Sequence, residues 1–68
     1  MLAHFSHFLE EKRRQTFAAV EDTQEALEQQ PADEHRRAAF EAARREHAGV
    51  LAAQELLRQF VHSLFVLY

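Results

Sequence analysis

The sequence contains a single glycine and a single proline, Pro31, in 68 residues. Each additional structural element needs its own turn, and turns favour these two residues, so such sparse punctuation predicts few, long elements. On both sides of Pro31, apolar residues recur every three or four positions, which is the spacing of α-helices. We therefore predict an all-α chain with helices at about residues 2–30 and 32–67 and a turn at about 30–33.

The segment around Pro31 contains residues that favour the start of a helix. Proline suits a first helical turn, and the Asp33 carboxylate can cap free amide groups. A connection this short predicts that the two helices pack antiparallel, as a hairpin. This arrangement would place Leu9 near Gln54 and Phe5 near Arg58.

The length limits the chain to one small domain, residues 1–68, with a modest core. The absence of cysteine excludes disulfides and thiolate zinc sites, which stabilise many small folds. A protein partner or dimerisation is the remaining means of stabilisation. We therefore expect the hairpin to be completed by one of the two.

The apolar faces of the two predicted helices differ in width. At about 100° per residue, the face of the first helix spans an arc of roughly 60°. It consists of Leu2, Phe5, Leu9, Thr16, Val20, Thr23 and Leu27. The apolar residues near the end of the second helix spread over about 180°, which is wider than one neighbouring helix can cover. The hairpin is therefore expected to leave apolar surface exposed.

That surplus surface lies at the open end of the hairpin, away from Pro31. Residues from about 62 onward would extend beyond the first helix by about 9 Å, at 1.5 Å per residue. An exposed apolar surface of this kind is typical of a docking site for another protein. The residues predicted to bind a partner are Phe5, Phe8, Leu9, Leu56, Leu57, Phe60, Val61, Leu64, Phe65 and Tyr68.

Charge and composition narrow the classes of function. A formal charge of −3 argues against nucleic-acid binding and against anionic membranes. No segment approaches the roughly 20 apolar residues that span a bilayer, and no signal-peptide pattern is seen, so a cytoplasmic location is expected.

Catalytic and metal-binding chemistry are not expected either. His4 and His7 lack a third ligand with helical spacing apart from nearby glutamates. Ser6 and Ser63 lie outside any strained turn, and a two-helix hairpin offers no pocket. We predict no enzymatic activity, no cofactor and no metal site.

Two interpretations of the apolar end are open. One is a homodimeric four-helix bundle, such as an RNA-binding regulator or a phage-type inhibitor of a host protein. The other is docking on a different protein that presents helices. The overhang favours the second interpretation, because a two-fold bundle of equal helices would more naturally end flush.

The stretch Ala52-Ala53-Gln54-Glu55-Leu56-Leu57-Arg58-Gln59-Phe60-Val61 resembles the second helix of small type III secretion co-chaperones of the YscE/PscE/SsaE kind. Chain size and hairpin layout are similar too. The resemblance implies that this protein pairs with a TPR-like chaperone, and that the two keep the needle subunit soluble in the bacterial cytoplasm. The turn Gln30-Pro31-Ala32-Asp33 also resembles that of needle subunits, but residues 63–68 lack the polar character of a needle tail.

Overall fold

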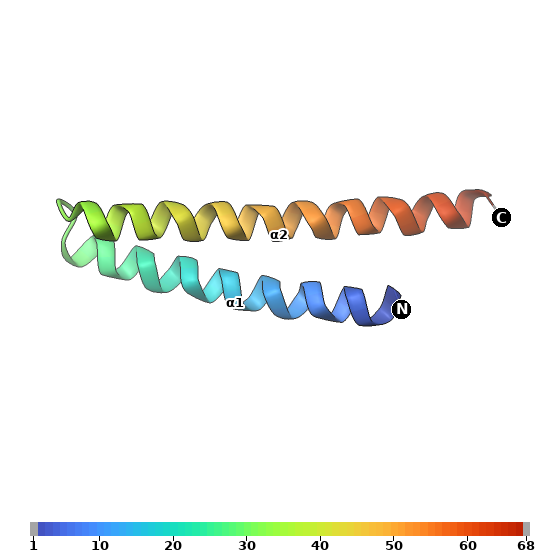
Figure 1. The fold of residues 1–68 in the computed structure, drawn as a ribbon, viewed down its shortest axis with the longest axis horizontal. Coiled ribbons are helices and arrows are strands. Elements are labelled where there is room, and N and C mark those ends of the chain that lie inside the picture. The colour runs from blue at the N-terminus through green and yellow to red at the C-terminus, as the bar shows by residue number, and fades with distance from the viewer. Residues whose placement is uncertain (1, 68) are drawn as a thin grey trace.

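The computed structural model describes the backbone of residues 2–67 and the side chains of residues 3–66. It contains helix α1, Leu2–Gln29, and helix α2, Glu34–Leu67, packed antiparallel as a hairpin (Figure 1). The Cα extents are 55 × 17 × 12 Å, so the hairpin is long, two helices wide and one helix thick. The prediction of an all-α, two-helix hairpin is confirmed.

The turn differs in detail from the prediction. α1 ends at Gln29 and α2 begins at Glu34, two residues later than expected, so Pro31 lies in the turn and outside the first turn of α2. Asp33 is the capping residue, as predicted: its Oδ1 accepts hydrogen bonds from the amides of His35 (2.9 Å) and Arg36 (3.2 Å). Because the Asp33 side chain occupies these amides, the helix begins after it.

The seam between the helices repeats with alternating steps of four and three residues, the spacing of a coiled coil. Its α1 side consists of Leu9, Arg13, Thr16, Val20, Thr23 and Leu27, and its α2 side of Phe40, Ala43, His47, Val50, Gln54, Leu57 and Val61. Among the described side chains, the buried ones are Leu9, Ala43 and Thr16, and each of them is still 5–9% exposed. The core of the hairpin is therefore thin and partly polar.

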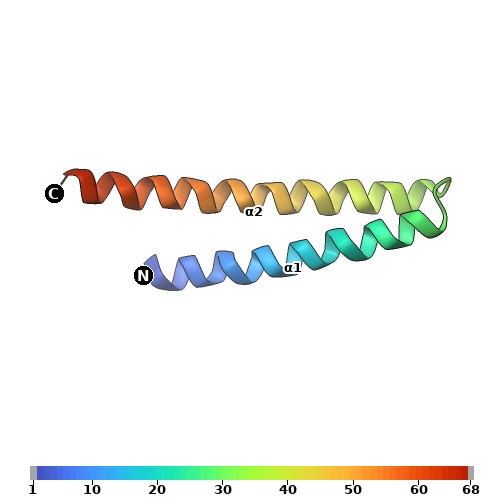
Figure 2. The ribbon, with the colours of Figure 1, turned by 180° about the vertical axis from the view of Figure 1, so that it is seen from behind.

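Contacts between the helices confirm the predicted register. Thr16 Oγ1 lies 2.8 Å from His47 Nδ1, and Gln54 donates a 3.2 Å hydrogen bond to Glu10, next to Leu9. Near the turn, Arg36 donates to the carbonyl of Ala26 at 2.7 Å. The helices lie closest at the turn and diverge toward the N-terminus of α1 (Figures 1 and 2). Small residues such as Ala43 permit close approach, whereas the larger Leu9 and Leu57 lie in the seam toward the open end.

The overhang of α2 is also present. The last turns of α2 extend past the start of α1 (Figure 1), and their side chains have no neighbouring helix. Phe65 and Val66 are accordingly 77% and 69% exposed. Neither α1 nor α2, over the residues described, contains a stretch long and apolar enough to cross a bilayer.

Candidate partner-binding surface

The hairpin has two broad faces, one seen in Figure 1 and the other in Figure 2. The two helices of an antiparallel pair are related by a local two-fold axis perpendicular to the broad faces. A residue that directly precedes a seam residue therefore lies on the same broad face in both helices. Phe5 precedes the inward-facing Ser6, and Phe60 precedes Val61 in the seam. Phe5 of α1 and Phe60 of α2 therefore share one broad face.

One turn away from each of these residues, Phe8 and Leu56 continue the same face, because residues three or four apart are neighbours on a helix. Leu64 extends it into the overhang. We call these five residues the apolar flank. They are large and exposed: Phe5 47%, Phe8 54%, Leu56 66%, Phe60 54% and Leu64 37%. The apolar flank is the largest concentration of exposed apolar side chains on one face of the described chain.

The opposite face is charged over most of its length. Its residues include Glu10, Arg14, Glu21, Glu28, Glu41, Arg44, Glu55 and Arg58. Several arginines already pair with carboxylates three residues earlier: Arg58 with Glu55, and Arg36 of the seam with Asp33 at 3.6 Å. Such pairs on an exposed helix favour solubility more than ligand binding.

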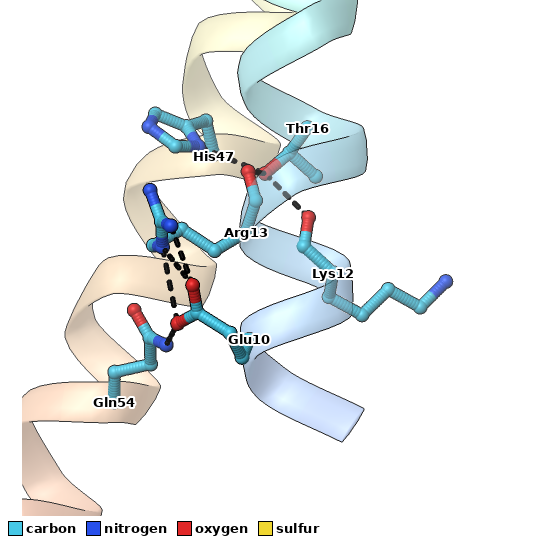
Figure 3. Close-up of polar contacts among 6 residues, drawn as sticks. All are labelled: Glu10, Lys12, Arg13, Thr16, His47 and Gln54. Atoms are coloured by element: carbon cyan, nitrogen blue, oxygen red, sulfur yellow. Dashed lines mark hydrogen bonds and ion pairs between the residues drawn. The ribbon is translucent and has the colours of Figure 1, made fainter. Parts of the chain in front are cut away.

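A polar cluster separates the open end from the middle of the seam (Figure 3). Glu10 reaches across from α1 to α2, where it accepts the hydrogen bond from Gln54, and it also accepts a 3.2 Å hydrogen bond from Arg13 Nε. The hydrogen bonds from Arg13 and then Gln54 lower the pKa of Glu10 to about 2. The same contact with Glu10 raises the pKa of Arg13. Glu10 therefore stays ionised and fixes the register where the helices begin to diverge.

Thr16 forms the second polar contact of this cluster. Its hydroxyl donates to the Lys12 carbonyl at 2.8 Å, which leaves the oxygen free to accept from His47 Nδ1. The ring of His47 also contacts Phe17, with centroids 5.8 Å apart. We assign His47 a structural role in the hairpin, because the residues that its ring contacts, Thr16 and Phe17, both belong to α1.

The predicted partner-binding residues fall into three groups. Phe5, Phe8, Leu56, Phe60 and Leu64 form the apolar flank. Leu57 and Val61 are half-buried in the seam, where they line a shallow open depression together with Ser6, Gln54 and Arg58. Phe65 is exposed but points to the other face, because it lies five residues, or about 140°, beyond Phe60.

The prediction is wrong for Leu9. This side chain is 6% exposed and is the largest buried one among the described residues, so it stabilises the fold and is not available to a partner. Its place in the narrow α1 seam was itself the signal that could have excluded it. The predicted contact through Tyr68 lies outside the described residues.

The sequence prediction missed Leu51 and left Phe17 out of its binding set. They are 45% and 49% exposed on the charged face, near the middle of the hairpin. Leu51 could have been found from its position at the far edge of the α2 arc. Among the described residues, no three histidine, aspartate or glutamate side chains are grouped so that they could hold a metal ion.

The total surface measures how much the hairpin leaves uncovered. Its accessible area is 5546 Å², whereas a compact monomer of 7.9 kDa has about 4,400 Å². The excess is roughly 1,100 Å², somewhat more than the ~800 Å² that each partner buries in a typical stable interface. One additional interface would therefore bring the chain to the exposure of an ordinary globular protein.

Comparisons with protein-family models, with curated proteins and with solved structures found no match for this chain.

Proposed function

We propose that this hairpin is a protein-binding module that docks its apolar flank onto the helices of another protein. The observation that carries the proposal is the contrast between the core and the surface. Among the residues that the structure describes, the buried apolar core is Leu9 and Ala43, whereas five large apolar side chains stand exposed together on one face. Contiguous apolar patches of this kind on small proteins mark interaction sites.

The physical benefit of docking would be mutual. A partner that binds only the folded hairpin raises its apparent stability, and the hairpin shields apolar surface of the partner in return. Aromatic side chains dominate the binding energy of many interfaces, and the apolar flank supplies three of them: Phe5, Phe8 and Phe60. The splayed open end would let a partner helix contact α1 and α2 together.

The more specific part of the proposal is a co-chaperone role. The hairpin would stabilise a TPR-like chaperone, a secretion needle subunit, or both, in the cytoplasm. This part is supported by the resemblance of residues 52–61 to the second helix of such co-chaperones. Leu56 and Phe60, the exposed large apolar residues in that stretch, belong to the apolar flank. In this role the protein acts by binding and not by catalysis.

The test is copurification of the tagged full-length chain from its host, with Phe60→Asp and Leu64→Asp as the disrupting variants. Each places a carboxylate in the middle of the proposed contact, so a specific companion should be lost. Arg37→Glu, near the turn and on the opposite face, is the matched control and should retain it. If all three variants retain the companion equally, the apolar flank is not the docking surface.

A further inference from the structure

The side chains on the broad face that carries the apolar flank change in size along the hairpin. The half near the open end carries phenylalanine and leucine. The half near the turn carries alanine at the equivalent positions: Ala19 and Ala26 on α1, Ala39 and Ala42 on α2. The charged residues on this face are Glu46 on α2 and Lys12 and Asp22 on α1, with Lys12 lying over the ring of Phe8. The face therefore carries large apolar side chains at the open end and mainly small side chains near the turn.

Gly49 lies between these two halves, close to the midpoint of α2, on the same face. Glycine in a helix interior lowers helix stability relative to alanine, so its presence calls for a packing reason. Within the hairpin there is none, since a Cβ placed on Gly49 would meet nothing within 4 Å. A glycine on an exposed apolar face is suited to the close approach of another backbone.

We propose that this face is the interface between two copies of the chain, packed antiparallel, with the two α2 helices crossing near Gly49. A two-fold axis through that point places the large half of each copy on the small half of the other. Leu56 and Phe60 then pack over Ala42 and Ala39 of the second copy, and large-on-small packing fills space well. The overhang of α2 runs along the first turns of the second copy's α2, so Leu64 is covered as well, whereas Phe65 points to the opposite face.

The area available suits this occupant. The excess surface of the whole chain, roughly 1,100 Å², exceeds the ~800 Å² per partner that a stable dimer buries, so it leaves room for one such interface. A parallel arrangement would instead place phenylalanine on phenylalanine at one end and leave alanine facing alanine across a gap at the other. Of the two arrangements, only the antiparallel one packs large side chains against small ones along the whole length of the face.

This inference goes beyond the proposed function. Because the dimer and a partner complex would use the same face, they exclude each other, and a partner would displace the second copy. A chain that is monomeric in solution would overturn the dimer and leave the proposed docking intact. A partner protein that still copurifies with the Phe60→Asp variant would overturn the proposed docking and leave the dimer intact.

The first experiment measures the mass of the full chain by light scattering over a range of concentrations. The expected mass is twice 7.9 kDa. Gly49→Leu should weaken the dimer by a factor of about 10 or more, because it inserts a side chain where the helices cross. Ala48→Leu adds a similar side chain on the charged face and should leave the dimer intact. A monomeric wild type, or a Gly49→Leu variant that dimerises as well as Ala48→Leu, would overturn the proposal.

The second experiment tests the orientation. The chain has no cysteine, so Ala32→Cys in the exposed turn provides a single site for a spin label. Antiparallel copies crossing near Gly49 would hold the two labels about 50 Å apart, from a rise of 1.5 Å per residue. Parallel copies would bring the two turns together, within about 20 Å, and that distance would contradict the proposed arrangement.

Discussion

Leu9→Ala is the substitution that most directly tests how thin the core of the hairpin is. Burying a leucine side chain contributes about 1.5–3 kcal/mol, and truncating it to alanine costs about 2–5 kcal/mol when a cavity remains. Leu9 is 6% exposed, so nearly all of the free energy of burying a leucine side chain applies to it. It borders an open depression lined by Ser6, Gln54 and Leu57, which lets the surroundings relax. We therefore expect a loss at the lower end of the range, about 2–3 kcal/mol.

The assay is urea unfolding followed by far-ultraviolet circular dichroism, at a concentration where the chain is monomeric. With a slope of about 1 kcal/mol per molar urea for a small domain, the midpoint should fall by about 2 M, or the variant should lose its helical signal before urea is added. Leu51→Ala is the matched control, because Leu51 is 45% exposed on the charged face, and it should cost less than about 1 kcal/mol. An equal loss in the two variants would refute the assignment of Leu9 to the core.

Three further predictions concern polar contacts. Asp33→Ala removes the cap of α2 and should lower the free energy of unfolding by about 1 kcal/mol in thermal denaturation, whereas an unchanged stability would contradict the capping role. Thr16→Val removes the acceptor for His47, so NMR should show proton occupancy of Nδ1 falling relative to the wild type, with about 1 kcal/mol of stability lost. The pKa of Glu10, about 2 against an ordinary value of 4.5, is lowered in the folded state, so its stabilising contribution is present above pH 4.5 and lost as the pH falls toward 2. Carboxyl NMR titration checks this, and a pKa of Glu10 near 4.5 would disprove the contact with Arg13 and Gln54.

The architecture of the chain could be predicted because it depends on short-range signals. Sparse glycine and proline, and apolar residues three or four apart, determine two long helices, and a short connection determines that they run antiparallel. The register between Leu9 and Gln54 followed from the position of the turn. The sequence predicts the start of α2 two residues too early, because Pro31 and Asp33 both suit the beginning of a helix. In the structure Asp33 forms the cap and α2 begins at Glu34.

The candidate surface could be predicted in part. The wide apolar arc of the second helix correctly indicated that Leu56 and Phe60 would be exposed, whereas the narrow arc of the first helix predicts Phe5 in the seam and Phe5 is instead 47% exposed. A helical arc alone does not separate the seam from the faces beside it, which is why Leu9 was assigned to a partner. The same limit applies to contacts between distant residues, since nothing local in the sequence pairs Thr16 with His47 or Glu10 with Gln54.

The division of the apolar side chains into a face and a seam is likewise a three-dimensional property. Phe60 and Phe65 are close in sequence and similar in character, yet they point to opposite faces of the hairpin. Only the position of α1 beside α2 distinguishes them. The same geometry explains why a Cβ on Gly49 would meet nothing within 4 Å, because α1 does not pack against that side of α2.

The hairpin alone leaves a large apolar surface uncovered, and the function proposed for it depends on this property. The most direct measurement is the solvent accessibility of side-chain protons, read by NMR with a soluble paramagnetic agent on the chain at concentrations where it is monomeric. Strong broadening is expected for Phe8, Leu56 and Phe60, and protection is expected for Leu9. Protection of Phe8 and Phe60 equal to that of Leu9 in the monomer would show that the hairpin buries its own apolar face, and the claim would be wrong.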